Sequence, residues 1–175
     1  SEFKVNTITN RDGSYGPQVC GITTFGSSGL QLPSGPTEFR GGRGRGIFFG
    51  GSPANPDNMT SVEIATTGNG SDFGNLANDL RNCKGCASST RGLIMGGGTP
   101  TYQNGIQGVT ISSSGGVFDF GDLLQAKRDN QCVSNNVRGI SAGGYVDPGV
   151  DIANIEFVTI ASTGDGSNFG GLNVK

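Results

Sequence analysis

Short apolar stretches alternate with glycine-rich breaks along most of this chain. Val62, Ile64 and Thr66, for example, occupy every second position of one stretch, which is the period of a strand with one buried face. β-Branched residues are concentrated in such stretches, and they favour a pleated surface. Double glycines and Asn-Gly dipeptides follow the stretches, as is typical of tight turns. The pattern predicts an all-β fold of short strands.

Three blocks of sequence recur in the same order three times. They are an Arg-Gly pair that leads into a double glycine, an alternating apolar stretch, and a Phe-Gly pair. Their first residues are, block by block, Arg45, Arg91, Arg138; Val62, Val109, Val158; and Phe73, Phe120, Phe169. The chain also has room for one more strand ahead of each arginine. We therefore predict three tandem four-stranded antiparallel repeats of about 47 residues, over residues 37–80, 81–127 and 128–175.

The first 36 residues depart from this pattern. They contain one partial strand pattern over residues 3–8, and they end in Pro33-Ser34-Gly35-Pro36, which is typical of a linker. We predict an N-terminal attachment arm over residues 1–36 and a three-repeat β domain over residues 37–175. The predicted partner-binding residues of the arm are Phe3, Val5 and Ile8. Alternatively, the arm supplies a strand that closes the repeat domain.

The number of repeats leaves the closure of the domain open. One repeat cannot bury both faces of its sheet, so neighbouring repeats must pack together. Propellers typically have about four to eight blades, so two chains could combine three blades each into one ring. Three sheets could instead close within one chain as a β-prism or β-trefoil with pseudo-threefold symmetry. The order of the blocks favours blades, whereas their number favours closure within the chain.

Composition and charge exclude several classes of protein. Gly accounts for 33 of the 175 residues, a density that disfavours helices and suits tight turns. The formal net charge of −2 gives no field that favours nucleic acid or an anionic membrane. No apolar run approaches the roughly 20 residues that cross a bilayer. The N-terminus lacks the features of a secretory signal, so we expect synthesis in the cytoplasm.

The residues available for chemistry argue against an enzyme. The chain has no His, which excludes Ser-His-Asp and Cys-His catalysis and His-based metal sites. Cys83 and Cys86 form a CxxC motif, but a zinc site usually needs a second such pair. We therefore expect Cys20, Cys83, Cys86 and Cys132 to be structural, with a metal or redox role as the alternative. No cofactor or metal is predicted.

Repeated acidic positions have a simple structural interpretation. Asp72 and Asp119 occupy equivalent positions, and Asn168 takes the third. Asp or Asn at a fixed turn position usually caps the backbone through its side chain, so we expect capping rather than acid–base catalysis. The segments 69–72 and 165–168 faintly resemble calcium loops but lack the later bidentate Glu, so we expect plain turns there.

Five arginines and two tyrosines are the remaining candidates. Arg45, Arg91 and Arg138 recur in register, which predicts a structural role such as hydrogen bonding to carbonyls between sheets. The aromatic positions in register are Phe73, Phe120 and Phe169.

Arg40 and Arg43 lie outside that register and are candidates for contact with an acidic partner. The alternative is RNA binding by the Arg-Gly tract over residues 40–46. Tyr102 and Tyr145 are candidate ligand-binding residues in loops, because exposed Tyr often anchors partners or sugars. Ordinary packing is the alternative for both.

Two family resemblances follow from these motifs. The double glycine, the alternating strand and the late aromatic resemble the kelch repeat of β-propellers, although Phe stands near the kelch Trp position and the kelch Tyr is absent. A closer resemblance, on residues 66–74 and 86–97 and on parts of the leader, is to repeat proteins of marine and cyanobacterial phages.

The phage resemblance implies a non-enzymatic virion structural protein. The short chain favours a small capsid or tail appendage, located in the virion and bound to other virion proteins. The alternative is a lectin-like adhesin, a tail-fibre module that binds host-surface glycans. A depolymerising enzyme is the least favoured hypothesis.

Overall fold

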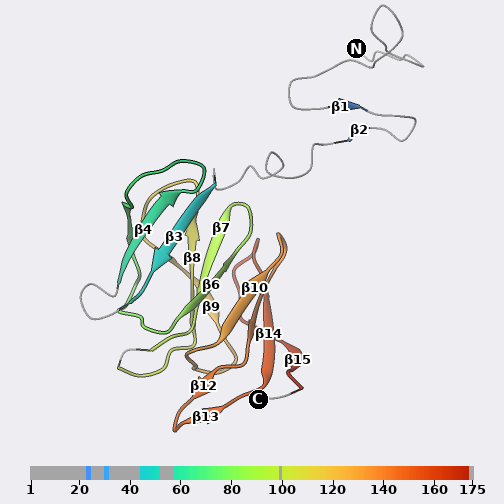
Figure 1. Ribbon diagram of the computed structural model, residues 1–175. Coiled ribbons are helices and arrows are strands. Elements are labelled where there is room, and N and C mark those ends of the chain that lie inside the picture. Colours follow the sequence, from blue (N-terminus) through green and yellow to red (C-terminus); the bar gives the residue numbers. More distant parts are fainter. Residues whose placement is uncertain (1–22, 25–29, 32–43, 52–56, 99, 174–175) are drawn as a thin grey trace, which may run out of the picture. The chain divides into compact units, whose positions relative to one another are not determined.

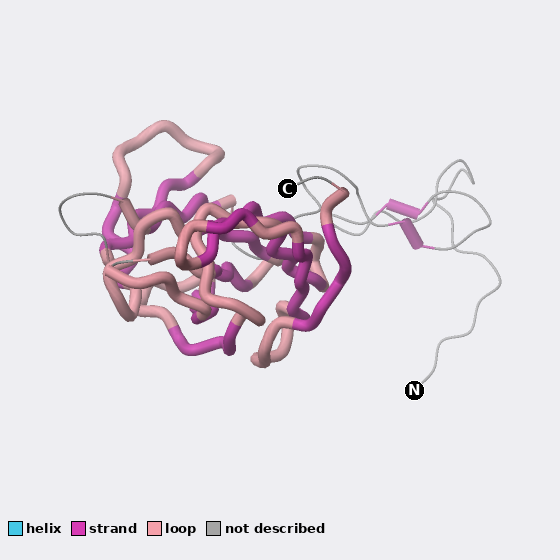
Figure 2. Tube along the Cα trace, turned by 90° about the horizontal axis from the view of Figure 1, so that it is seen from below, coloured by secondary structure: helices cyan, strands magenta, loops and turns pink. Residues whose placement is uncertain are grey.

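The described residues form strands, turns and loops. The computed structural model describes residues 23–24, 30–31, 44–51, 57–98 and 100–173. Within these ranges there is no helix, as Figure 2 shows, so the prediction of an all-β chain is confirmed. It follows that the described ranges contain no long apolar helix of the kind that crosses a membrane.

The chain divides into two compact units, Ser1–Arg40 and Gly41–Lys175. In the first unit, the two-residue strands β1 (Thr23–Thr24) and β2 (Leu30–Gln31) pair in antiparallel fashion. The second unit contains the remaining strands and both hydrophobic clusters.

Three antiparallel sheets follow one another along the second unit (Figure 1). Sheet 1 has the order β3-β4-β5, over Arg45–Phe49, Asn58–Glu63 and Ser71–Asn75. Sheet 2 has the order β6-β7-β8-β9, over Lys84–Ala87, Arg91–Met95, Gly105–Thr110 and Phe118–Asp122. Sheet 3 has the order β10-β11-β14-β15, over Gln131–Ser134, Arg138–Ala142, Asn154–Thr159 and Ser167–Gly171. A small hairpin of β12 (Tyr145–Val146) and β13 (Val150–Asp151) interrupts the third sheet in sequence.

The three sheets share one pairing register. The arginines that open β3, β7 and β11 lie opposite Glu63, Thr110 and Thr159, respectively. Each sheet also has a register shift at the same place, after Met59, Ile106 and Ile155. The recurring blocks of sequence therefore lie in corresponding strands.

The double glycine ends the first strand of each block for a conformational reason. In sheet 2, Gly96 and Gly97 have φ values of 65° and 105°, a region that other residues rarely adopt. A side chain on Gly97 would also collide with the backbone carbonyl of Arg81. The chain can therefore leave the sheet at this point without strain only because both residues are Gly.

Each hydrophobic cluster lies between two neighbouring sheets. Junction 1–2 combines side chains from sheet 1 and the segment after it with two from sheet 2, namely Met59, Phe73, Leu76, Leu80, Ile94 and Val109. Junction 2–3 combines side chains from sheet 2 and the segment after it with two from sheet 3, namely Leu93, Met95, Ile106, Phe120, Leu123, Val158 and Ile160. Leu93 and Ile94 are neighbours on β7, yet they enter different clusters, because successive side chains of a strand point to opposite faces.

Sheet 2 therefore packs between sheets 1 and 3. In the described part of the chain, the three sheets close into neither a barrel nor a propeller. Sheets 2 and 3 have the expected four strands, whereas the described residues of sheet 1 form three. The fourth strand that the sequence predicts for sheet 1 falls before Gly44, outside the described residues.

Candidate functional site

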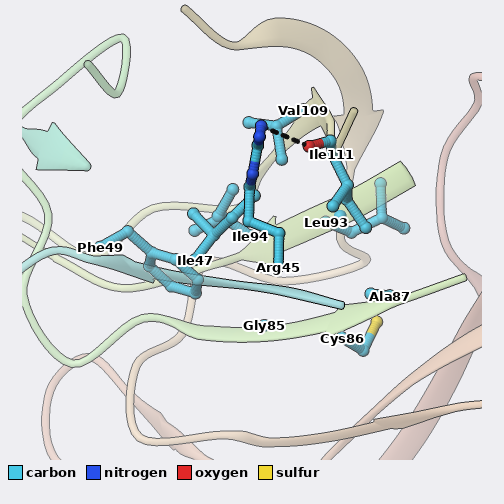
Figure 3. Close-up of a pocket in the computed structure, with 11 residues that line it drawn as sticks. Arg45, Ile47, Phe49, Gly85, Cys86, Ala87, Leu93, Ile94, Val109 and Ile111 are labelled. Carbon is cyan, nitrogen blue, oxygen red and sulfur yellow. Dashed lines mark hydrogen bonds between the residues drawn. The ribbon is translucent and has the colours of Figure 1, made fainter. Parts of the chain in front are cut away.

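Two of the three arginines in register connect neighbouring sheets. Arg45 Nη1 donates a hydrogen bond to the carbonyl oxygen of Ile111 at 3.1 Å, drawn as the dashed line in Figure 3. Arg91 Nη1 makes the corresponding bond to the carbonyl of Ile160 at 2.8 Å. Arg138 has no further sheet beyond it among the described residues, and its guanidinium lies 4.7 Å from the ring centroid of Phe157.

The groups beside these arginines differ between sheets. The Arg91 guanidinium lies 5.2 Å from the centroid of Phe118, on β9. In sheet 3 the ring comes from Phe157 on β14 instead. Arg45 pairs with the exposed carboxylate of Glu63 at 3.1 Å. The three sheets thus carry an arginine at the same position, although the groups beside its guanidinium differ.

A cavity of about 250 Å³ lies in junction 1–2, with the labelled side chains of Figure 3 around it. Its walls come from β3, β6, β7 and β8, and they include Ile47, Phe49, Cys86, Leu93 and Val109. At junction 2–3, the first strand of sheet 2 packs beside β10, where Ser134 Oγ accepts the Ala87 N–H at 3.1 Å. The residues that the sequence predicts to form the corresponding strand of sheet 1 lie outside the described residues. The cavity walls are mostly apolar, so the cavity belongs to the sheet junction and lacks the several converging polar groups that orient a ligand.

Tyr102 and Tyr145 come together although they lie in different parts of the sequence. Their ring centroids are 6.4 Å apart, with an angle of 53° between the planes. The Arg128 guanidinium lies 4.9 Å from the Tyr102 centroid and 5.5 Å from the Tyr145 centroid. Two backbone hydrogen bonds between Arg128 and Tyr145, of 3.1 and 2.8 Å, hold this arrangement.

A hollow of about 480 Å³ opens beside this aromatic pair. We call it the tyrosine hollow, and its lining residues are Pro100, Thr101, Tyr102, Gln125, Ala126, Val146 and Asp147. An aromatic face next to an amide and a carboxylate can stack on a polar ligand and hydrogen-bond to it. Among the predicted site residues, Tyr102 lines this hollow, and Tyr145 packs against Tyr102 without lining it.

The described cysteines are free thiols within the junctions. Cys83 packs at junction 1–2, whereas Cys86 and Cys132 pack at junction 2–3. Burial raises the pKa of Cys86 to about 11 and that of Cys132 to about 12, and it also raises the pKa of Cys83. Burial thus favours the protonated form of these thiols, and the protonated form is not the nucleophile. Within the described ranges, no three Cys, Asp or Glu residues group in a way that could hold a metal ion.

The acidic residues at turns serve the backbone. Asp72 Oδ1 accepts the N–H of Gly74 at 3.1 Å, so the predicted capping is confirmed at this position. Asp165 Oδ1 accepts the N–H of Asp122 at 2.9 Å and thereby links sheet 3 to sheet 2.

A buried ion pair at junction 2–3 was missed by sequence reasoning. Lys127 Nζ lies 2.5 Å from Glu156 Oε1, and both side chains are buried. Glu156 Oε2 also accepts the N–H of Leu124 at 2.7 Å. The matching positions at junction 1–2 hold Leu80 and Gln107. A signal was present, since a Lys replaces a Leu and a Glu replaces a Gln at aligned positions of the repeats.

The remaining predicted residues fall into three groups. Phe73 and Phe120 are buried in the junctions, whereas Phe169 is half exposed. The predicted partner-binding residues lie outside the described residues, and they are Phe3, Val5, Ile8, Arg40 and Arg43.

Comparison of the chain with models of protein families gives no match, and comparison with curated proteins gives none. The resemblances to phage repeat proteins and to kelch repeats therefore stay predictions from sequence motifs.

Proposed function

We propose that this chain is a non-enzymatic structural protein of a phage particle, a small appendage of the capsid or tail. The observation that carries the proposal is the use of the recurring residues. Arg45 and Arg91 bond to the next sheet, and Phe73 and Phe120 fill the junctions. The recurring residues therefore hold neighbouring sheets together. A structural role of this kind is what we expect of a component of a particle. The resemblance of the motifs to phage repeat proteins supports the virion as its location.

In this proposal the three sheets are tandem repeats of one blade-like unit. The shared pairing register and the shared register shift support that interpretation. Blade-type sheets of the kelch kind pack in series, as sheets 1, 2 and 3 do. A β-prism or β-trefoil, the alternative, requires sheets 1 and 3 to pack against each other.

Residues 1–36 form the attachment arm of the proposed appendage. Its apolar residues Phe3, Val5 and Ile8 bind other virion proteins, and Arg40 and Arg43 beside it contact acidic groups of the same partner. The test is to label the protein on purified particles made with the full chain or with residues 37–175 alone. We expect the full chain on the particle and the truncated chain in the unassembled fraction.

A variant with Phe3, Val5 and Ile8 changed to Ala should be lost from particles as the truncated chain is. The matched control changes the polar neighbours Lys4 and Asn6 to Ala and should be incorporated normally. Absence of the full chain from purified particles contradicts the proposed function. Normal incorporation of the truncated chain contradicts only the role of the arm.

A second candidate function is glycan binding, favoured by the tyrosine hollow. Tyr102 presents an aromatic face beside Gln125 and Asp147, a combination suited to the apolar and hydroxyl faces of a sugar. On a panel of bacterial surface glycans, we expect Tyr102→Ala to abolish binding and Tyr102→Phe, which keeps the ring, to retain most of it. A wild-type chain that binds no glycan on the panel contradicts this candidate function.

A further inference from the structure

The first sheet of the series exposes apolar side chains whose counterparts are buried. Ile64 follows β4 and is 71% exposed, whereas the corresponding Ile111 and Ile160 are 6% and 1% exposed. Phe48 on β3 is 62% exposed, whereas the corresponding Ile94 is 1% exposed. The difference arises because sheets 2 and 3 each have a preceding sheet on this face. We call the face of sheet 1 that carries Phe48, Val62 and Ile64 the leading face.

The last sheet shows the same difference on its opposite face. Phe169 is 51% exposed and Leu172 is 43% exposed, whereas the corresponding Phe120 and Leu123 are 2% and 3% exposed. Val133 on β10, which corresponds to the half-buried Cys86, is 63% exposed. We call the face of sheet 3 that carries Val133, Arg138, Phe157, Phe169 and Leu172 the trailing face.

These two faces hold most of the exposed apolar surface in the described residues. Of the eight large hydrophobic residues exposed there, five lie on them: Phe48, Ile64, Val133, Phe169 and Leu172. Stacked repeat proteins usually end in repeats with a polar outer face, because a bare apolar face makes the chain insoluble. Among the residues that the structure describes, neither end of this series carries such a polar cap, which makes both ends candidate binding faces.

We propose that the trailing face of one copy of this chain packs on the leading face of a second copy. The two faces are the halves of a contact that the chain already makes twice, at junctions 1–2 and 2–3. The trailing face carries the same Arg, Phe and Leu positions that sheets 1 and 2 use toward the next sheet. The leading face carries the same Val and Ile positions that sheets 2 and 3 present to the preceding one. A second copy is therefore the partner whose surface carries the positions that the internal junctions use.

The polar contacts of this interface follow from the internal junctions. Arg45 and Arg91 each donate to the carbonyl of the Ile that follows the third strand of the next sheet, β8 or β14. By the same relation, Arg138 donates to the carbonyl of Ile64 in the second copy. Its guanidinium already lies over the ring of Phe157, on the trailing face.

A backbone hydrogen bond should join the copies in the same way. Gly115 donates its N–H to the Phe73 carbonyl, and Gly164 donates to the Phe120 carbonyl, both at 2.7 Å. The corresponding pair between copies is the N–H of Gly68 and the carbonyl of Phe169.

The close approach of glycines leaves an open slot on the trailing face. A Cβ atom on Gly74 would collide with the Gly115 carbonyl, and one on Gly121 would collide with the Gly164 carbonyl. A Cβ atom on Gly170, the third glycine of this set, would meet nothing within 4 Å. The slot that the internal junctions fill with a turn of the next sheet is therefore free in a single copy, and Gly68 of the second copy fits it.

One contact of the internal junctions is missing from this interface. Gln107 and Glu156 accept N–H groups of Ala77 and Leu124 from the preceding sheet. The corresponding residue of sheet 1 is Thr60, whose side chain is shorter. The contact between copies therefore lacks this hydrogen bond of the internal junctions, and we expect it to dissociate on dilution.

The contact is heterologous, since two different faces meet, and this makes a sharp test possible. The full chain is studied by sedimentation over a range of concentrations, as wild type and as Ile64→Asp, Leu172→Asp and Val150→Asp variants. The first variant places a charge on the leading face and the second places one on the trailing face. Val150 is 49% exposed on β13, outside both faces, and serves as the matched control.

We expect the wild type and Val150→Asp to self-associate equally. Each of the other two variants should lose at least about tenfold in association constant, since a charge would be buried without a partner. Circular dichroism and thermal unfolding should show that all four proteins are folded. An equimolar mixture of Ile64→Asp and Leu172→Asp should restore association as a one-to-one pair, because one intact face of each kind remains.

Three results would overturn the proposal. The first is a wild-type chain that stays monomeric at every concentration, which would mean that the chain covers its own faces. The second is self-association that neither variant weakens. The third is a mixture of the two variants that stays monomeric, because this would mean that an intact leading face and an intact trailing face do not bind each other.

Discussion

Junctions 1–2 and 2–3 share the arginine and glycine contacts between sheets but differ in the side chain that accepts one N–H of the preceding sheet. At junction 1–2, Gln107 accepts the N–H of Ala77 at 2.9 Å beside the buried Leu80. At junction 2–3, Glu156 accepts the corresponding N–H, and the buried Lys127 lies beside it. An N–H group left without a partner inside a junction would be costly, so both sheets supply an acceptor.

The difference shows how a charge enters the core of this protein. An amide acceptor needs no counter-charge, and an apolar neighbour such as Leu80 can pack beside it. A carboxylate in the same place is strongly destabilising unless a cation accompanies it. The changes from Gln107 to Glu156 and from Leu80 to Lys127 are therefore coupled, and together they make the two junctions chemically distinct. We expect this distinction to favour the observed order of the sheets.

The largest effect should come from the phenylalanines that the two junctions share. Phe73→Ala and Phe120→Ala should each lower the free energy of unfolding by about 3–5 kcal/mol, since both rings are buried at matching positions. Phe169→Ala should cost less than about 1 kcal/mol under conditions where the chain is monomeric. Denaturant unfolding monitored by circular dichroism measures all three. A loss at Phe169 as large as that at Phe120 would show that sheet 3 is covered within a single copy.

The second-largest effect should come from disrupting the ion pair between Lys127 and Glu156. Replacing both residues with those found at junction 1–2 should recover most of the lost stability. Lys127→Leu should cost about 3 kcal/mol, because Glu156 is left buried without its cation. The double variant Lys127→Leu/Glu156→Gln copies the Leu80 and Gln107 pair, and it should regain most of that loss. The measurement is the free energy of unfolding of both single variants and the double variant. A double variant no more stable than Lys127→Leu would contradict the coupling of the two positions.

The arginines should show a smaller effect that depends on the junction. Arg91→Ala removes a hydrogen bond to the Ile160 carbonyl and a ring contact with Phe118, and it should cost about 1.5–3 kcal/mol. Arg138→Ala, beyond both junctions, should change the free energy of unfolding of the monomer by less than about 0.5 kcal/mol. Thermal unfolding at low protein concentration compares them directly. Equal losses would mean that Arg138 has a buried partner in the monomer.

The smallest effect should be a pH dependence that reports on junction 2–3. Burial raises the pKa of Cys132 to about 12 from an ordinary value of 9.0. The folded state therefore holds this proton more tightly than the unfolded state does. The resulting stability is complete below about pH 9 and is lost as the pH rises toward 12.

The free energy of unfolding of the wild type should fall more steeply above pH 9 than that of Cys132→Ser. A Cys83→Ser variant, at junction 1–2, provides the comparison. Identical pH dependence of the wild type and Cys132→Ser would show that the Cys132 thiol is open to water in the folded state.

The strands were predictable because their signals are local. The alternation around Val62 and Ile64 reflects the two-residue period of a strand. The double glycine at Gly96 and Gly97 reflects the backbone conformation of two neighbouring residues. The recurrence of Arg45 and Arg91 at equivalent positions also predicted that their side chains connect neighbouring sheets. The buried Lys127 and Glu156 pair was not predicted, because the two residues are 29 positions apart in the sequence and meet only across a junction.

The candidate ligand site shows the same limit. The sequence predicts Tyr102 and Tyr145 in loops, whereas Tyr145 lies on β12. Their contact with each other and with Arg128 depends on how segments of sheets 2 and 3 meet. The exposure of Phe169 could not be predicted from its place in the repeat either, since the equivalent residues Phe73 and Phe120 are buried.

By itself, the sequence determined the all-β class, the strands of each block and the places where the chain turns, because period and glycine conformation act within a few residues. The tertiary structure alone decided which face of each sheet is covered, which charge is paired and which apolar residues stay exposed. These properties depend on the neighbouring sheet: among the described residues no sheet covers Ile64, whereas sheet 1 lies against Ile111.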